Sequence, residues 1–380
     1  MTESTPKDPV TPLQAQLEAA AQPPIGPFPF RVGIIGSGFI VRDVALPAYV
    51  AAGVPVAGVA SRHRERAAAA VAQAGAGRPY TTPEELLDDP QVEIVEIAYP
   101  PHLQPGLIRQ ACARRHVRAI LVQKPLALAT DEAAAAVDTA RRAGKILAVN
   151  QNMRFDQGIL VAAHALRTGL LGQPVLASIE MRAVPHWQEF LGHYDRLTIA
   201  NMSVHHLDVL RYLLGEPLTV ATTTAADPRS PGRPGDGIVL TQLTLASGAI
   251  GFSLEDVWVA PDASLAEAGQ SVRWRITGTA GVVEGTCGWP QWPQRCPSTA
   301  RYLGDASGGA WVRPRWTTSW FPDAFVSVMS AVQGAVAAGR EPANSGSDHL
   351  RTLALVDAAY ASARSGHPIG LSPEQERTIA

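Results

Sequence analysis

Two patterns of apolar residues divide the chain near residue 152. From residue 30 onward, short apolar runs alternate with stretches of helical period; the runs are FRVGIIG, VPVAGVA, VEIVEIAYP, VRAILVQ and KILAVN. Continuous rather than alternating apolar character is typical of parallel strands that are buried on both faces. Strands separated by helices therefore predict a doubly wound α/β domain over residues 30–152.

The second pattern predicts an α+β domain over residues 153–380, with a largely antiparallel, open sheet packed on helices. PVLASIEMRAV and IVLTQLTL-ASG-AIGFSLEDVWV have longer strand-like runs, and a tight Ser-Gly turn joins the last two. VRWRITGTAGVVEGT resembles another hairpin, and two stretches near the C-terminus have helical period. Residues 1–29, rich in Pro, Ala and polar residues, are expected to form a flexible tail.

Composition excludes several classes of partner and site. The net charge is −2 and no run of five or six like charges occurs, which argues against a nucleic-acid or anionic-membrane partner. No stretch of about 18 uninterrupted apolar residues is present, and the first residues lack the pattern of a secretory signal. Cys112, Cys287 and Cys296 are too scattered for a disulfide framework or a cysteine-based zinc site. We therefore expect a cytoplasmic protein.

A glycine-rich turn follows the first predicted strand. Gly36, Ser37 and Gly38 stand where that strand meets a helix, which Phe39 and Ile40 begin. Glycine lets the backbone approach the pyrophosphate of a dinucleotide, and a helix N-terminus presents free N–H groups to it. Val41 replaces the third glycine of the usual pattern, but the surrounding alternation still predicts a Rossmann dinucleotide-binding domain.

The end of the second predicted strand indicates which dinucleotide is bound. NAD-specific sites carry Asp or Glu there to bind the ribose 2′-hydroxyl, whereas this chain has Ser61 and Arg62. A hydroxyl donor and a guanidinium suit a 2′-phosphate, which a carboxylate would repel. The sequence therefore predicts NADP in preference to NAD, unless Arg62 only belongs to a solvated helix start.

Lys124 stands at the end of another predicted strand, directly before Pro125. Ligands of open α/β sheets collect outside the carboxyl ends of the strands, and proline restricts the local backbone. We therefore expect the Lys124 ammonium to be held beside the nicotinamide.

At this point the chain resembles the glucose-fructose oxidoreductase/inositol dehydrogenase (Gfo/Idh/MocA) family. The resemblance rests on Gln-Lys-Pro at 123–125, where the family has Glu-Lys-Pro, and on three further segments in order. These are IAYPPHLQPGLIRQA, which differs from the family at Tyr99, Pro100 and Gln104; VNQNMRFDQ; and NMSVHHLDVLRYLLGEP, with Asn201 where the family has Asp.

The resemblance implies hydride transfer between nicotinamide and a sugar, polyol or sugar acid. It implies that Lys124 and His205 serve the reacting oxygen; we expect His205 to be the general acid/base, with Asp208 fixing its orientation. It further implies cofactor contacts from Tyr99, Pro100, His102 and Gln123, substrate contacts from Arg154 and Asn201, and a homodimer or homotetramer. A non-catalytic nicotinamide-binding sensor or scaffold is the alternative.

The losses of a carboxylate at Gln123 and Asn201 leave three outcomes open. Fewer nearby anions should lower the pKa values of Lys124 and His205. The site could instead accept an anionic substrate, with Arg154 or Arg182 as its partner, or it could have lost catalysis.

Two further interpretations concern the segment before the predicted catalytic helix. Trp187 and Tyr194 could stack on the apolar face of a sugar ring, or could belong to a loop that packs on the sheet. The histidines here, including His205 and His206, match no common zinc spacing, so no metal is expected.

Overall fold

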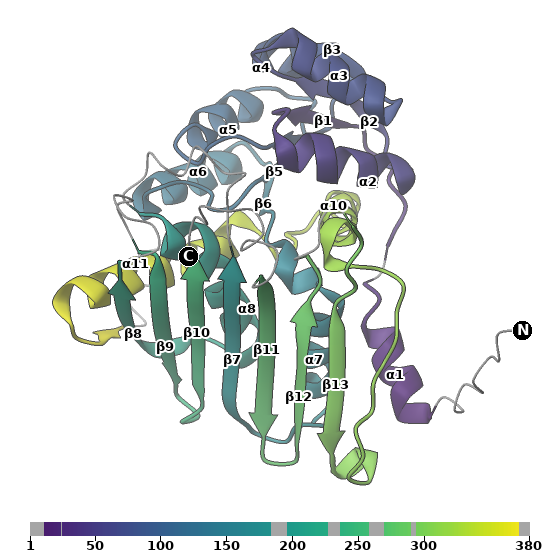
Figure 1. The fold of residues 1–380 in the computed structure, drawn as a ribbon. Coiled ribbons are helices and arrows are strands. Elements are labelled where there is room, and N and C mark those ends of the chain that lie inside the picture. The colour runs from purple at the N-terminus through teal and green to yellow at the C-terminus, as the bar shows by residue number, and fades with distance from the viewer. Residues whose placement is uncertain are drawn as a thin grey trace, which may run out of the picture.

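A computed structural model of the protein describes residues 11–23, 25–183, 196–226, 236–257, 270–289 and 294–371. The first domain, at the top of Figure 1, contains a parallel six-stranded sheet in the order β3-β2-β1-β4-β5-β6, which confirms the predicted doubly wound fold. Its strands are β1 (Val32–Ile35), β2 (Val56–Ala60), β3 (Arg78–Tyr80), β4 (Ile94–Ile97), β5 (Ala119–Val122) and β6 (Ile146–Val149). The strand order reverses between β1 and β4, and ligands bind at this point in sheets of this kind.

Helices cover both faces of this sheet. They are η1 (Ile40–Ala45, a π-helix that continues directly into α2), α2 (Leu46–Ala51), α3 (Arg64–Ala74), α4 (Pro83–Leu87), α5 (Gln104–Cys112) and α6 (Thr130–Arg142). A further helix, α10 (Trp320–Ala338), comes from the far end of the chain and packs on the face that α2 covers. Its Phe325 and Met329 are buried in one core with Leu121 of β5. The C-terminal part of the chain therefore completes the first domain, which a division at residue 152 does not capture.

The second domain contains an eight-stranded sheet in the order β13-β12-β11-β7-β10-β9-β8-β14. Its strands are β7 (Pro174–Ala183), β8 (Pro217–Ala225), β9 (Ile238–Leu245), β10 (Ile250–Val257), β11 (Ser271–Gly278), β12 (Gly281–Cys287), β13 (Thr299–Gly304) and β14 (Ile369–Gly370). All neighbouring pairs are antiparallel except β7 with β10, and the two predicted hairpins, β9–β10 and β11–β12, are confirmed.

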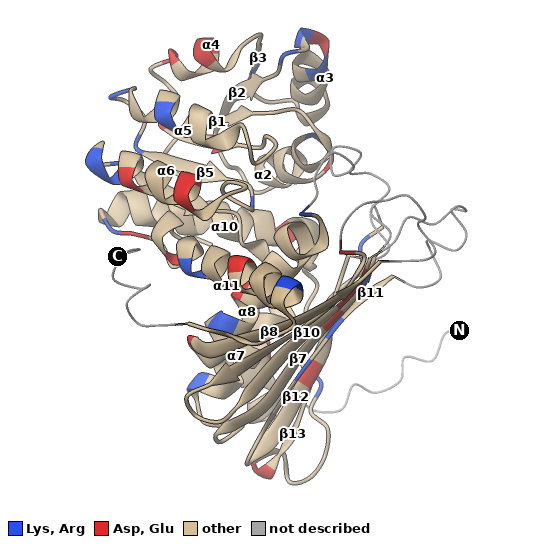
Figure 2. Cartoon of the chain, turned by 90° about the vertical axis from the view of Figure 1, so that its left-hand side faces the viewer, with Lys and Arg blue, Asp and Glu red and all other residues tan. Residues whose placement is uncertain are grey.

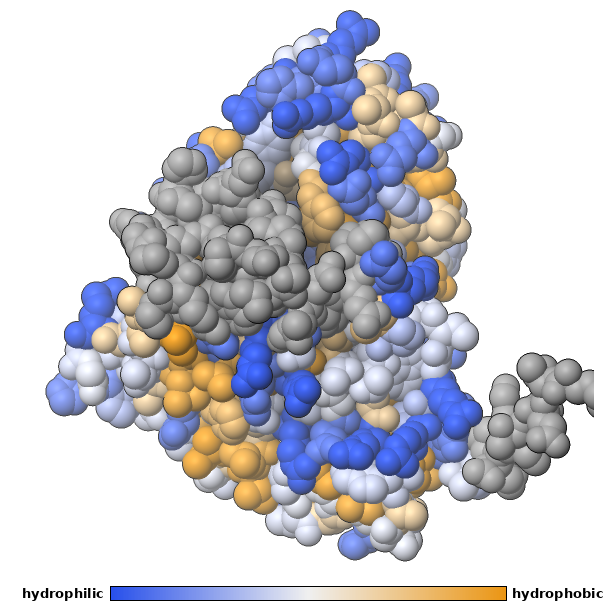
Figure 3. All heavy atoms as spheres, in the orientation of Figure 1, coloured by the Kyte–Doolittle hydropathy of each residue, from blue (hydrophilic) through white to orange (hydrophobic). Residues whose placement is uncertain are grey.

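One face of the second sheet carries helices, and no helix of the described residues covers the other, which is called the open face. The remaining helical elements are η2 (Asn152–Phe155), α7 (Gln157–Arg167), η4 (Ile199–Ser203), α8 (Val204–Leu214), η5 (Asp305–Ser307) and α11 (Gly346–Ser365). In Figure 2, α7, α8 and α11 all lie on one side of the sheet. On the other side, apolar side chains gather over β9 and β10 (Figure 3), where Leu240 and Ile250 are exposed.

The prediction of a flexible tail over residues 1–29 is wrong for the described part of it. Residues Pro12–Ala20 form helix α1, which Thr11 caps and which packs on α7. Leu13 and Leu17 are one helical turn apart, so they share a face, and Leu17 is buried in the core of the second domain. A single apolar turn was too short a signal to indicate this contact.

Helix α10 is long and apolar enough, by composition alone, to cross a membrane. Half of its apolar window is buried inside the protein. Such burial is typical of a core helix, and α10 packs in the core of the first domain.

Candidate active site

The glycine turn after β1 has the shape that a dinucleotide requires. Gly36 has a φ of 121°, and a side chain there would begin 2.4 Å from the carbonyl oxygen of Ala98. Only glycine fits such a position. A Cβ at Gly38, by contrast, would meet nothing within 4 Å, so the backbone there is open to an approaching group. The turn lies at the start of η1, and these residues therefore fit a pyrophosphate.

The next two residues continue the turn into the fold. Ile40 begins η1, and the ring of Phe39 stacks on Phe321 of α10 with the ring centroids 6.5 Å apart. The C-terminal part of the chain thus fixes the position of the cofactor turn.

The end of β2 lies beside this turn. The Ser37 hydroxyl donates to the Ser61 hydroxyl at 2.8 Å, and Ser61 also accepts the backbone N–H of His63 at 3.3 Å. Ser61 is buried, whereas Arg62 is exposed. A hydroxyl has one proton of its own to donate, so Ser61 keeps that capacity after accepting these bonds.

Further residues of the candidate site follow β4 and β5. Tyr99 and Pro100 are half-buried after β4, His102 is exposed in the same loop, and Gln123 and Lys124 follow β5. All lie at the carboxyl ends of parallel strands, so the residues predicted from four separate segments come to one edge of the sheet.

Lys124 connects the two domains at this edge. Its Nζ donates to the backbone oxygen of Asn201 and, at 3.1 Å, to the Asn201 Oδ1. Asn201 is in η4, and Asp236 holds the start of that element by accepting the backbone N–H groups of Leu197 and Ile199 at 3.0 and 2.7 Å. Burial lowers the pKa of Lys124 to about 7. The direction agrees with the sequence-based expectation, although desolvation is the cause.

His205 lies in α8, four residues beyond Asn201 and close enough to Lys124 to feel its charge. Burial lowers the pKa of His205 well below its ordinary value, and the positive charge of Lys124 lowers it further. The His205 ring meets Trp320 edge-on at 6.5 Å, and the Trp320 Nε1 donates to Asn152 Oδ1 at 3.2 Å. Among the described residues, the buried Nδ1 of His205 has no hydrogen-bond partner.

Gln123 is held from behind by a buried carboxyl group. Its Nε2 donates to Glu96 Oε1 at 3.1 Å, and its Oε1 accepts Asn150 Nδ2 at 3.2 Å. Glu96 also accepts the Tyr49 hydroxyl at 2.8 Å, and burial raises its pKa to about 7. Sequence reasoning missed Glu96, because a charged residue within an apolar run gives no sign of its partners.

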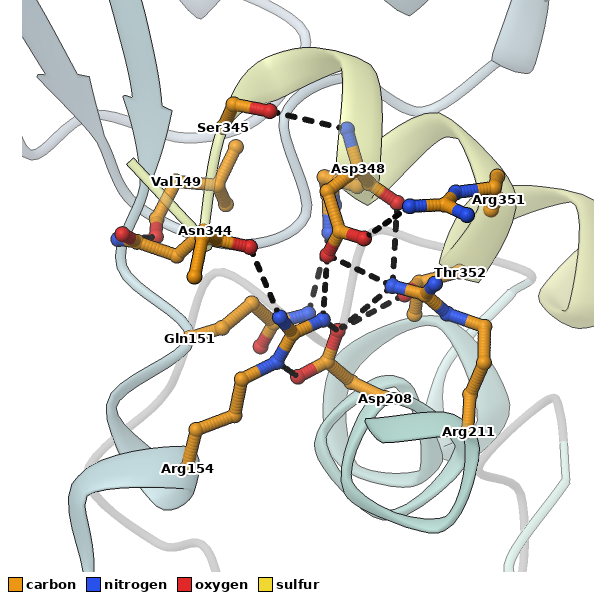
Figure 4. A network of polar contacts seen from close by, with 12 residues as sticks. Val149, Gln151, Arg154, Asp208, Arg211, Asn344, Ser345, Asp348, Arg351 and Thr352 are labelled. Carbon is orange, nitrogen blue, oxygen red and sulfur yellow. Dashed lines mark hydrogen bonds and ion pairs between the residues drawn. The ribbon is translucent and has the colours of Figure 1, made fainter. Parts of the chain in front are cut away.

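Arg154 does not have the substrate role predicted for it. Its guanidinium makes two 2.5 Å hydrogen bonds to Asp208 and one to Asp348 (Figure 4). It also donates to the carbonyl of Ala343 at 3.0 Å. Only 6 % of the Arg154 side chain is exposed. The side chain therefore joins η2 to α8 and α11.

Two related predictions are also wrong. Asp208 does not orient His205: its carboxylate binds Arg154 and accepts the Thr352 hydroxyl at 2.8 Å. Arg182 lies on the exposed side of β7, opposite the face that α8 covers, and its guanidinium is 4.0 Å from Asp256.

Some predictions cannot be compared with the fold. Trp187 and Tyr194 lie outside the described residues. Within the described residues, no group of three or more His, Cys, Asp or Glu side chains could hold a metal ion.

Comparison with known proteins assigns both domains to one family. Residues 30–151 match the family model for the NAD-binding Rossmann fold of the Gfo/Idh/MocA oxidoreductases, and residues 164–371 match the model for their C-terminal α/β domain. The D-apiose dehydrogenase of Paraburkholderia graminis is 28 % identical over 345 residues, which cover 90 % of each chain. Inositol 2-dehydrogenase 2 of Paenarthrobacter aurescens is 29 % identical over 54 % of this chain and 62 % of its own.

Solved structures share the fold over nearly the whole chain. An oxidoreductase from Agrobacterium radiobacter, in complex with NAD+, L-tartaric acid and magnesium, has a TM-score of 0.75 at 23 % identity and covers 90 % of this chain and 98 % of its own. Aldose-aldose oxidoreductase from Caulobacter crescentus, complexed with glycerol, has a TM-score of 0.75 at 22 % identity, over 90 % and 99 %. The family models span both domains, and the chain therefore belongs to the Gfo/Idh/MocA family of NAD(P)-dependent oxidoreductases.

Proposed function

We propose that the protein is a cytoplasmic, NADP(H)-preferring dehydrogenase that oxidises a CH–OH group of a sugar, polyol or sugar acid. The observation that carries the proposal is the meeting of Lys124, from the first domain, with Asn201 and His205, from the second. Two groups that can exchange a proton thus converge at the carboxyl edge of the Rossmann sheet, beside the glycine turn that fits a dinucleotide.

Oxidation of an alcohol removes a hydride from carbon and a proton from oxygen. When bound, the nicotinamide supplies the hydride acceptor. His205 takes the hydroxyl proton, because its depressed pKa keeps the imidazole neutral at physiological pH. Lys124 orients the same oxygen and stabilises negative charge that develops on it. With a pKa of about 7, Lys124 can also accept or return that proton.

The preference for NADP rests on charge at the end of β2. Ser61 retains a proton to donate, Arg62 is exposed beside it, and no carboxylate stands at that strand end to repel a phosphate.

A turnover screen tests the proposal. The purified protein is offered D-apiose, inositols, aldoses and sugar acids with each cofactor, and nicotinamide absorbance is followed. We expect turnover of at least one of these compounds, with a higher kcat/KM for NADP than for NAD. Cofactor binding without turnover of any compound would favour the non-catalytic alternative.

Two single substitutions then test the roles of the two groups. Lys124→Met and His205→Asn should each lower kcat by roughly 10²- to 10⁴-fold, the usual worth of a positioned proton-transfer group. Asn201→Asp restores a carboxylate beside Lys124, so it should raise the pKa that appears in the pH–rate profile. An unchanged profile in Asn201→Asp would refute the charge argument.

A further inference from the structure

Gln104 makes an unusual set of contacts for a side chain at the start of a helix. It begins α5, and no part of it is exposed to solvent. Its Nε2 donates to the backbone carbonyls of Gln123, Pro125 and Leu126 at 2.9, 2.8 and 3.3 Å. Its Oε1 accepts the backbone N–H of Gln123 at 3.1 Å.

These contacts determine the orientation of the Gln104 amide, that is, which side its NH2 group and its oxygen each face. Three of the four facing groups are carbonyl oxygens, which can only accept, so the NH2 must point toward them. The segment held in this way, residues 123–126, contains Lys124. Its other side is held less closely, by the Leu126 N–H donating to His349 Nε2 at 3.4 Å.

The position of Lys124 depends on this segment. The Lys124 ammonium reaches Asn201 of the other domain, so a small movement of its backbone would break that contact and admit water. Buried carbonyls that lose their donor are costly, and a segment that carries three of them would rearrange to reach water.

We infer that Gln104 is a positioning residue, which clamps the segment 123–126 so that the Lys124 ammonium meets the reacting oxygen. This inference rests on the proposed function for its catalytic meaning. The placement of Lys124 itself can be measured without turnover.

Gln104→Met is the decisive variant, because methionine has nearly the same length and removes all four hydrogen bonds without adding charge. We expect kcat to fall roughly 100-fold, with the cofactor KM within about threefold of the original, as for a displaced catalytic group. The midpoint pH for acylation of Lys124, followed by peptide mass spectrometry across pH, should rise by about one unit or more. A solvated ammonium returns toward its ordinary pKa of about 10.4, which leaves less free amine.

Gln110→Met is the matched control. Gln110 is half-buried on the same helix, and its side-chain oxygen has no hydrogen-bond partner among the described residues. This variant should keep the acylation profile and kcat of the original protein. Gln104→His restores one N–H donor and should recover part of both, which a loss of folding alone would not explain.

A folded Gln104→Met protein with the original acylation profile overturns the inference, and so does a Gln104→His protein as impaired as the methionine variant. If the original protein turns over no substrate, the proposed function fails. The acylation profiles still decide the role of Gln104.

Discussion

Removal of one charge from the network in Figure 4 should destabilise the protein far more than the same change on the surface. The substitution is Asp208→Asn, which keeps the shape of the side chain. Arg154 and Arg211 here face Asp208 and Asp348, and Arg211 also pairs with Glu216 at 2.8 Å. Without the Asp208 charge, Arg154 keeps only the ion pair with the half-buried Asp348, which Arg211 shares.

Breaking a buried ion pair by removing one partner costs about 3–5 kcal/mol. Asp208 is 1 % exposed and Arg154 6 % exposed, so the full penalty applies. At roughly 2–4 °C per kcal/mol for a domain of this size, the thermal midpoint of unfolding should fall by about 6–20 °C. Scanning calorimetry of the whole chain measures this shift.

Asp138→Asn is the matched control. Asp138 pairs with Arg141 and Arg142, whose side chains are 74 % and 77 % exposed, and such surface pairs contribute little to stability. If the midpoint of Asp208→Asn falls no further than that of Asp138→Asn, the buried network does not stabilise the fold in the way argued.

Three other outcomes are expected. Arg154 and Arg211 lower the pKa of Asp348 to about 2, so the ionised carboxylate stabilises the folded state by about 2 kcal/mol. This stabilisation is complete above the ordinary pKa of about 4 and is lost as pH falls toward 2. Asp348→Asn should therefore flatten the acid side of a plot of the thermal unfolding midpoint against pH. Arg62→Ala should weaken NADP about tenfold and leave NAD unchanged, in fluorescence titrations at one salt concentration. If the open sheet face joins two copies of the chain, as we expect, Leu176→Asp should dissociate the oligomer in light scattering, whereas Val175→Asp, on the opposite face of the same strand, should not.

Local patterns were enough to predict most of the strands, the two hairpins and the glycine turn, because each depends on residues that are close in sequence. They did not predict β3, β8, β13 or β14. The parallel sheet followed from continuous apolar runs, and Gly36 from the sharp turn that a strand-to-helix junction needs. The helical spacing of Asp208 from His205 was also read correctly as local geometry. It gave the wrong partner, because Arg154, 54 positions away, offers Asp208 a full opposite charge.

Contacts between segments that are far apart in the sequence could not be predicted from it. Nothing in the composition of α10 indicates that it covers the Rossmann sheet, since any buried helix would have the same apolar character. Trp320 enters the site only through that packing. Gln104 differs from the family residue at its position, but the difference did not reveal the three carbonyls that it binds.

The absence of a glutamate before Lys124 has a physical explanation in Glu96. Gln123 Nε2 lies 3.1 Å from Glu96 Oε1. The Glu96 carboxyl group is fully buried, and this burial raises its pKa to about 7. A second carboxylate at position 123 would place two like charges in contact without water, and one of them would have to be protonated. An amide avoids this conflict, because it donates to Glu96 and accepts from Asn150. Gln123 is therefore matched to its neighbours, and its presence is no sign that the site has lost its chemistry.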